Sequence, residues 1–279
     1  MTDEPLLSFG VIADPQYADQ DDDLAMNRYF RNSLNKLAEA TATFESEDLS
    51  FIITLGDLID RGWQNFEAPL EIYRRSRHEI LFLAGNHDFL VEPEKVAEVR
   101  PRLGMPRGYY SFCRSGIRFL VVDGCEESLF AAGLDERIKA SATERLDNLI
   151  EQGAINAKDW NAGMSQSQFV WIESELETAR QKGQEVIVLG HYPLVPLTDH
   201  CLWDADVLSD LLARHAHVRA YLNGHDHRGG LGRQGDCWFV TFKGMVDTAQ
   251  ENAFAIVDVF ADRLKIRGFG RELSRSLDR

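Results

Sequence analysis

The sequence predicts an α/β fold built on parallel strands, and two observations lead to this prediction. Short apolar segments typical of buried strands alternate with segments of helical periodicity over residues 6–84. Polar segments rich in Asp, Asn, Gln and His directly follow several of the expected strands. Such alternation is typical of βαβ units, and ligands of open α/β sheets collect beyond the carboxyl ends of the strands.

Three buried strands are expected in the first third of the chain, at 6–13, 49–55 and 80–84, with helices between them at 24–44 and 66–77. The longer helix is predicted from apolar residues that recur at helical spacing among charged ones, namely Phe30, Leu34, Leu37 and Phe44. The resulting order of elements favours a parallel sheet.

The pattern changes after the third strand. Segments 109–112 and 117–123 flank a short turn-forming stretch and predict a hairpin. Residues 124–163 are the least regular part and contain one helical stretch at 142–150. We interpret 124–163 as an insertion within a single domain that spans 1–279.

A helix is expected to begin after Ser165, an N-cap residue. Its apolar face would hold Phe169, Ile172, Leu176 and Ala179. The other expected elements are strands at 185–189, 218–222, 237–242, 253–260 and 264–268 and a helix at 205–215. The last arginines are expected on a strand and a frayed tail, and they are Arg267, Arg271, Arg275 and Arg279.

The composition limits the classes of partner. The chain has 279 residues, of which 44% are hydrophobic, enough for one large core or two modest ones. Its formal net charge of −15 disfavours long nucleic acid, because an acidic surface repels a phosphate backbone. A small anionic substrate remains possible, since bound metal ions dominate the local field of a site.

The remaining bulk features predict a cytoplasmic protein. The four cysteines, Cys113, Cys125, Cys201 and Cys237, form no C-x-x-C pair and suit a reducing compartment. The acidic start of the chain, Met1 to Pro5, does not resemble a signal peptide. No apolar run approaches the roughly 20 residues that a membrane span needs.

Five short polar segments carry the functional signal. They are Asp14-Pro15-Gln16, Gly56-Asp57-Leu58-Ile59-Asp60, Gly85-Asn86-His87-Asp88, Gly190-His191-Tyr192-Pro193 and Gly224-His225-Asp226-His227. Each alone could be a loop or a cap. Together they supply enough ligands for two divalent ions, the usual clamp for hydrolysis of a phosphate ester or anhydride.

The expected metal centre has two sites that share one carboxylate. Asp57 is the candidate bridge, because both of its oxygens have spare lone pairs. Site one would add Asp14, Gln16 and His227, and site two would add Asn86, His191 and His225. Mixed oxygen and imidazole ligands suit Mn²⁺, Fe or Zn²⁺, and the neutral oxygen of Gln16 favours Mn²⁺, with Mg²⁺ possible.

His87 is the candidate catalytic residue. It follows a ligand in sequence and is expected to face the substrate as proton donor or as a stabiliser of the transition state. Asp60 and Asp88 are expected to orient ligand or catalytic histidines, and Asp226 to point away from the metals. The other histidines, His78, His200, His215 and His217, are expected to be surface or core residues and not metal ligands.

The five segments resemble the calcineurin-like metallophosphoesterase superfamily, with its D-x-H, GD-x-x-D, GNH-D/E, GH and GH-x-H blocks. The resemblance implies a four-layer α/β/β/α sandwich with two mixed sheets and a dinuclear site at one edge. In this chain Gln16 replaces the usual histidine of the first block. The stretch Asp14-Pro15-Gln16-Tyr17-Ala18-Asp19 is similar to the opening of the manganese-dependent ADP-ribose/CDP-alcohol diphosphatases.

That branch implies cleavage of a nucleoside diphosphate compound at its pyrophosphate to give a nucleoside monophosphate. Residues beside the ligands are candidates for substrate contact, and they are Tyr17, Tyr192, Cys201, Trp203 and Arg228. The alternative is a packing role for the first four of them and a solvated surface position for Arg228. The alternative functions are a less specific phosphodiesterase, for example for cyclic nucleotides, a phosphomonoesterase, and a non-catalytic scaffold.

Overall fold

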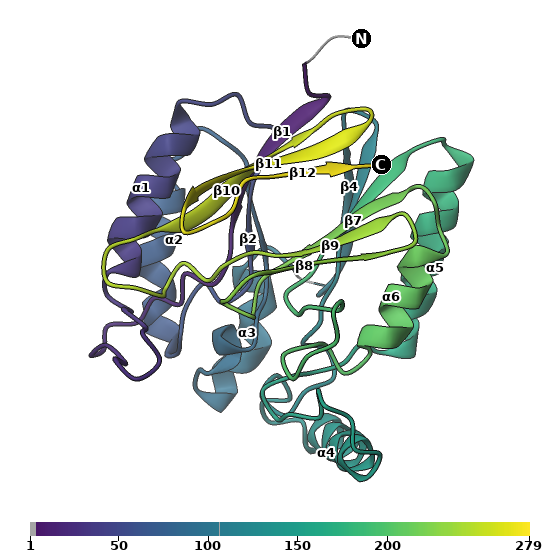
Figure 1. Cartoon of the computed structure of the whole chain (residues 1–279). Helices are drawn as coiled ribbons and strands as arrows, with labels where there is room; N and C mark the ends of the chain where they lie inside the picture. Colours follow the sequence, from purple (N-terminus) through teal and green to yellow (C-terminus); the bar gives the residue numbers. More distant parts are fainter. Residues whose placement is uncertain (1–3, 106) are drawn as a thin grey trace.

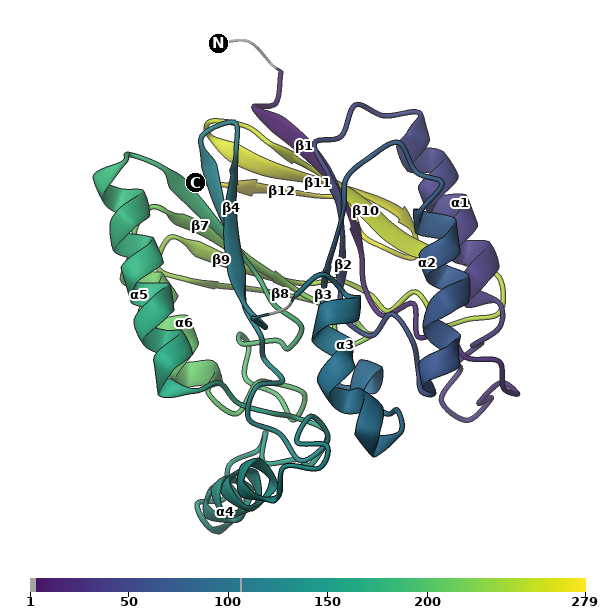
Figure 2. The ribbon, with the colours of Figure 1, turned by 180° about the vertical axis from the view of Figure 1, so that it is seen from behind.

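The computed structural model describes residues 4–105 and 107–279, and it confirms the expected α/β/β/α sandwich. Two six-stranded mixed sheets face each other, and helices cover the outer face of each (Figures 1 and 2). The start of the chain, used above to judge a signal peptide, lies outside the described residues at positions 1–3. No helix within the described ranges is long and apolar enough to cross a membrane.

The first sheet has the order β12-β11-β10-β1-β2-β3. Its strands are β1 (Leu7–Ile12), β2 (Ile52–Leu55), β3 (Ile80–Leu83), β10 (Ala253–Val259), β11 (Arg263–Gly270) and β12 (Arg275–Asp278). The first three are parallel, and β10 joins β1 antiparallel. Helices α1 (Ser33–Glu45) and α2 (Glu67–Tyr73) cover the outer face (Figure 2).

The second sheet has the order β4-β5-β6-β7-β9-β8. Its strands are β4 (Tyr110–Arg114), β5 (Ile117–Val121), β6 (Glu185–Leu189), β7 (Val218–Asn223), β8 (Gly230–Gln234) and β9 (Cys237–Thr241). Strands β5, β6, β7 and β9 are parallel, and β4 and β5 form the expected hairpin. Helices α5 (Gln166–Gln181) and α6 (Ala205–Ala213) lie outside, and Ser165 caps α5 by accepting a hydrogen bond from Gln168 N.

Aromatic side chains join the two sheets. Phe9 of β1 and Phe51, which directly precedes β2, stack with ring centroids 4.9 Å apart. Both meet Phe119 of β5 edge to face, at 5.5 and 5.1 Å. Phe112 of β4 stacks on Phe119 at 5.0 Å. This buried contact fixes how the sheets sit on each other and therefore which strand ends meet.

The helix expected at 24–44 begins only at Ser33. The carboxylate of Asp23 accepts hydrogen bonds from the backbone of Ala25 and Met26, which holds these residues in a turn. Asn27 has a φ of 57°, which is incompatible with a right-handed α-helix at this position. Phe30 is buried beside Ala18 and Val246, so its apolar character reflects loop packing.

Three elements were not expected from the sequence: α3 (Val96–Arg102), β8 and β12. Helix α3 contains Pro101 and buries only Val96 and Val99 among its described residues, so its apolar pattern is too short to recognise. The edge strands β8 and β12 are half exposed, and β8 contains two glycines, so neither strand reads as an apolar run. The expectation of a frayed tail was therefore wrong, because Arg275 to Asp278 pairs with β11.

The segment 124–163 carries α4 (Glu136–Glu151), which lies at one end of the molecule, away from the sheets (Figure 1). This helix begins at Glu136, before the expected start at 142, because Asp135 caps it by accepting hydrogen bonds from Arg137 N and Ile138 N. Arg145 of α4 pairs with Glu127 of the same segment and with Asp204, which precedes α6.

Candidate metal centre

The polar segments after β1, β2, β3, β6 and β7 meet at one edge of the two sheets. The ring nitrogen Nε2 of His191, after β6, lies 3.1 Å from Asn86 Oδ1, after β3, and 3.4 Å from Asp57 Oδ2, after β2. His225, after β7, places Nδ1 3.2 Å from the same His191 nitrogen. Segments from both sheets thus contribute to one cluster.

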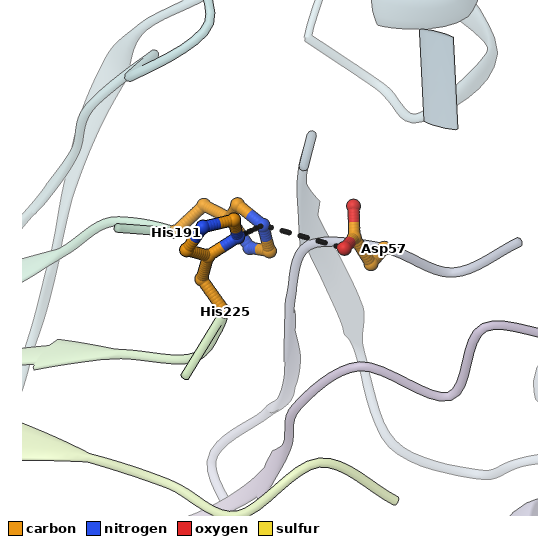
Figure 3. A group of neighbouring side chains, drawn as sticks. All are labelled: Asp57, His191 and His225. Atoms are coloured by element: carbon orange, nitrogen blue, oxygen red, sulfur yellow. Dashed lines mark hydrogen bonds and ion pairs between the residues drawn. The ribbon is translucent and has the colours of Figure 1, made fainter. Parts of the chain in front are cut away.

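Asp57, His191 and His225 form the centre of this cluster (Figure 3). One ligand atom from each lies within 4.8 Å of the others, and all three side chains are buried. A carboxylate oxygen and two imidazole nitrogens at such spacing can coordinate one divalent ion.

The residues assigned to site one lie beside Asp57. The Gln16 amide nitrogen Nε2 is 3.0 Å from Asp57 Oδ2 and 3.2 Å from His227 Nε2. His227 Nε2 is 3.7 Å from Asp14 Oδ1. The structure therefore brings together all seven residues that the sequence analysis proposed as ligands.

Glycines allow this crowding. A Cβ at Gly85 would lie 2.1 Å from Asp57 Oδ1, and a Cβ at Gly224 would lie 2.5 Å from Asp14 Oδ2. Both distances are far below van der Waals contact, so any side chain there would displace a candidate ligand. The glycines that open the third and fifth motifs are thus required by the close approach of the backbone to the carboxylates.

Four candidate ligands adopt backbone conformations that are uncommon outside glycine. The φ angles of Asp14, Gln16, Asp57 and His225 are 50°, 44°, 53° and 67°. Strained residues of this kind cluster at functional sites, where the surrounding fold stabilises them.

The donor set fits divalent ions. Gln16 Oε1 is buried and has no hydrogen-bond partner among the described residues, which is costly for an amide oxygen without a cation or water. Rotating the amide by 180° exchanges its oxygen and nitrogen and would direct Oε1 toward Asp57 and His227, where a metal would stand. The carboxylates, amides and imidazoles present match the mixed ligation of Mn²⁺, Fe or Zn²⁺.

Burial and opposite charges perturb the titration of the cluster. Burial raises the pKa of Asp14 to about 6. Burial also opposes ionisation of Asp57, but His191 and His87 outweigh it and lower the pKa of Asp57. Burial disfavours the charged form of His191, yet Asp57 raises its pKa to about 9. Metal binding would therefore compete with a proton held between Asp57 and His191.

His87 lines the cavity. Its Nδ1 lies 3.0 Å from Oδ1 of Asp60 and 3.2 Å from the backbone oxygen of the same residue. Its backbone N donates to Asp57 Oδ1 at 2.8 Å. Burial disfavours the imidazolium, but Asp57 and Asp60 outweigh it and raise the pKa of His87. Asp60 is therefore placed to orient His87 and to favour the form that can donate a proton.

Asp88 differs from the expectation that it orients a histidine. Its Oδ2 accepts hydrogen bonds from the backbone of Asp57 and Gly85, and its Oδ1 accepts one from Ile59. This buried carboxylate instead fixes the loop that carries Asp57 in its unusual conformation. Burial and the neighbouring Asp57 raise the pKa of Asp88 to about 7.

A cavity of about 330 Å³ opens directly over the cluster. Beyond the candidate ligands and His87, its wall is formed by Met26, Arg28, Trp160 and His200. The first two belong to the turn-rich segment before α1, Trp160 to segment 124–163, and His200 to the loop after β6. His200, which was not expected to be a ligand, is not among the candidate ligands but does line the cavity.

The five proposed substrate contacts lie outside this wall. Three of them are buried and bonded elsewhere, because Tyr192 donates to Trp160 O, Trp203 to Lys158 O, and the Cys201 thiol to Pro196 O. Arg228 is 70% exposed and pairs with Asp226, and Tyr17 forms a bridge with Ile59. Tyr17, Tyr192 and Arg228 directly follow candidate ligands, but neighbouring side chains point to opposite sides of an extended chain, so adjacency did not identify the cavity wall.

Asp247 is a site residue that the sequence analysis missed. Its Oδ1 accepts a hydrogen bond from Nδ1 of His227 at 2.9 Å, which leaves Nε2 free for a metal. Lys36 of α1 holds this segment by donating to the backbone oxygens of Met245, Asp247 and Thr248 at 2.9, 2.6 and 2.6 Å. No strand-end motif surrounds Asp247 in the sequence, so only its proximity to His227 reveals the role.

Replacing Asp247 with alanine is expected to weaken metal binding at one of the two sites by about 10–100-fold, the usual effect of losing an acceptor behind a histidine ligand. Titration with Mn²⁺, followed by calorimetry or electron paramagnetic resonance, measures this change. The exposed Asp236, which lies on the turn between β8 and β9, provides a control as Asp236→Ala. If Asp247→Ala bound Mn²⁺ at both sites with unchanged affinity, Asp247 would not support His227 as a ligand.

Comparison with known proteins agrees with this geometry. The family model for the calcineurin-like phosphoesterases matches residues 7–229. A manganese-dependent ADP-ribose/CDP-alcohol diphosphatase of Arabidopsis thaliana is 29% identical, with 99% of this chain and 98% of the relative covered. The human protein of the same name is 25% identical, with 99% and 93% covered.

A solved structure of a dimetal phosphatase from Danio rerio superposes with a TM-score of 0.87 at 22% identity, and 99% of each chain is covered. This likeness supports the fold, and the family match covers all five motifs of the metal cluster. The chain therefore belongs to the calcineurin-like phosphoesterase family of metal-dependent hydrolases.

Proposed function

We propose that this protein hydrolyses the pyrophosphate bond of nucleoside diphosphate compounds such as ADP-ribose and CDP-alcohols, using two divalent ions. The carrying observation is the cavity that lies directly over the metal cluster and combines Arg28 with Trp160 and His200 in its wall. A cation suits the second phosphate of a diphosphate, and aromatic faces suit a nucleobase or sugar. The relatives named above support the same substrate class.

Asp57 would bridge the two ions, with Asp14, Gln16 and His227 at one site and Asn86, His191 and His225 at the other. When bound, such an ion pair lowers the pKa of water and stabilises charge on phosphoryl oxygens. We favour Mn²⁺, because Gln16 offers a neutral oxygen and the relatives are named manganese-dependent.

The protein groups perform the remaining steps. Arg28 and His87 line the same cavity, so both can address the diphosphate. His87, oriented by Asp60, donates a proton to the oxygen of the departing phosphate. Trp160, with 43% of its surface exposed, offers an apolar face to the nucleoside or the alcohol moiety.

Purified protein with Mn²⁺ is expected to release AMP from ADP-ribose and CMP from CDP-choline, as followed by chromatography. Parallel assays with Mg²⁺ and Zn²⁺ identify the preferred ion. Cleavage of bis-p-nitrophenyl phosphate without either nucleotide would favour a less specific phosphodiesterase. Lack of cleavage of every substrate with every metal would favour the scaffold alternative.

The cysteines support the proposal of a reducing, cytoplasmic location. All four are free, and Cys125, Cys201 and Cys237 are buried. Cell fractionation with a tagged full-length chain tests this location.

A further inference from the structure

The three candidate histidine ligands present different ring nitrogens to the cluster, and each choice is set by a hydrogen-bond acceptor behind the ring. His191 donates from Nδ1 to Leu55 O at 2.8 Å, and His227 donates from Nδ1 to Asp247 Oδ1 at 2.9 Å. A backbone carbonyl and a carboxylate can only accept hydrogen bonds, so Nδ1 of each of these two histidines carries the hydrogen. Nε2 is then the nitrogen with a free lone pair in each neutral ring.

His225 has the opposite arrangement. Its Nδ1 faces the cluster, 3.2 Å from His191 Nε2, and its Nε2 lies 3.1 Å from Asn161 Oδ1. For Nδ1 to bind a metal, the hydrogen of the neutral ring must reside on Nε2. The group that faces Nε2 therefore decides whether His225 can act as a ligand in this position.

The orientation of the Asn161 amide leaves no ambiguity about which group faces Nε2. Asn161 is fully buried, and its Nδ2 lies 3.0 Å from Asn156 O and 2.7 Å from Asp199 O. Two backbone carbonyls can only accept, so the NH₂ group must point to them and Oδ1 must point to His225. All hydrogen-bonding groups of this amide are thereby used.

We propose that Asn161 is a positioning residue that holds His225 with its hydrogen on Nε2 and so delivers Nδ1 to the metal centre. The inference rests on the proposed metal-dependent function and extends it to the insertion. Segment 124–163 is then a working part of the metal site, because it contributes the group that selects the ligand atom of His225.

The attachment of the insertion supports this role. The segment around Asn161 is held against the loop after β6, since the indole of Trp203 donates a hydrogen bond to Lys158 O at 3.1 Å. Tyr192, which directly follows a candidate ligand, donates to Trp160 O at 3.2 Å. These bonds hold Asn161 at a fixed distance from His225 while Trp160 reaches the cavity wall.

Three variants test the proposal, and Asn156→Ala is the matched control. Asn161→Ala removes the acceptor behind His225. Asn161→Asp keeps an acceptor there but loses both donations to Asn156 O and Asp199 O. Asn156→Ala removes a buried amide of the same segment that makes no contact with His225. Circular dichroism and thermal unfolding confirm that each variant is folded.

The first readout needs no metal. In the metal-free full-length protein, nitrogen-15 NMR of the histidine rings is expected to show His225 protonated on Nε2 in the wild type and in Asn156→Ala. In Asn161→Ala the signal should shift toward a mixture of both tautomers, whereas Asn161→Asp should retain the wild-type form. An unchanged His225 signal in Asn161→Ala would overturn the proposal.

The second readout is Mn²⁺ binding. Asn161→Ala is expected to bind one of two ions about 10–100-fold more weakly, because it loses the hydrogen-bond acceptor behind the ring of His225. The Mn²⁺ affinities of Asn161→Asp and Asn156→Ala should stay close to those of the wild type. Equal losses in Asn161→Asp or in Asn156→Ala would show a merely structural role and overturn the proposal. If the wild type hydrolyses no nucleotide, the proposed function fails, but the NMR result still decides the role of Asn161.

Discussion

Replacing Asp57 with asparagine is expected to remove both metal ions and to abolish hydrolysis. The side chain lies at the centre of the cluster, with Oδ2 3.0 Å from the Gln16 amide and 3.4 Å from His191 Nε2. An amide offers one oxygen and no charge, so it can neither bridge two ions nor balance the nearby histidines. Affinity at both sites should fall by more than the roughly 100-fold that marks loss of an outer partner.

The fold should survive this change. Asp57 has a φ of 53°, and asparagine tolerates the left-handed region as well as aspartate does. Metal content by plasma mass spectrometry and turnover with Mn²⁺ are the measurements, with thermal unfolding as a check. Asp258→Asn, which changes a buried aspartate paired with Arg267 far from the cluster, is the control. One tightly retained ion in Asp57→Asn would refute the bridging role.

Replacing His87 with alanine is expected to leave metal binding intact and to lower kcat by about 10²–10⁴-fold, the usual contribution of a general acid. The His87 ring is held by Asp60 through Nδ1 at 3.0 Å, so the ring is committed to an orienting partner and its other nitrogen is available to substrate. The nearby carboxylates raise its pKa, which favours the protonated form needed for donation.

A change of leaving group sharpens this test. A p-nitrophenolate leaves without help from an acid, so His87→Ala should lose much less activity on a p-nitrophenyl ester than on ADP-ribose. Equal losses on both substrates would indicate stabilisation of the transition state instead of proton donation. A parallel loss of metal would show that His87 is itself a ligand.

The central strands could be predicted from the sequence because their burial leaves a direct mark. Strands such as β2 and β6 read as short runs of Ile, Val and Leu. Edge strands β8 and β12 bury few side chains and left no such mark. The start of α1 was misplaced because Phe30 packs in a loop, and apolar spacing alone does not distinguish a loop contact from a helical face.

The candidate ligands could also be proposed from sequence, since each follows a strand and carries a side chain with metal-binding chemistry. The residues that surround these ligands could not be proposed from the sequence. Asp247, Asn161 and Arg28 lie in segments without a recognisable pattern, and their roles depend on distances to His227, His225 and the cavity. Tyr192 lies within a motif and Trp203 follows it in the same loop, yet both side chains are buried and neither lines the cavity.

The sequence by itself determined the class of fold and which residues are candidate metal ligands, because burial patterns and side-chain chemistry are local properties of the chain. Only the tertiary structure decided which nitrogen each of these histidines presents, which groups lie behind the rings and which side chains line the cavity. Those properties arise where segments far apart in sequence meet, as where Asn161 contacts His225 after β7. Hydrogen bonds of this kind depend on distance and direction in space, which no local pattern encodes.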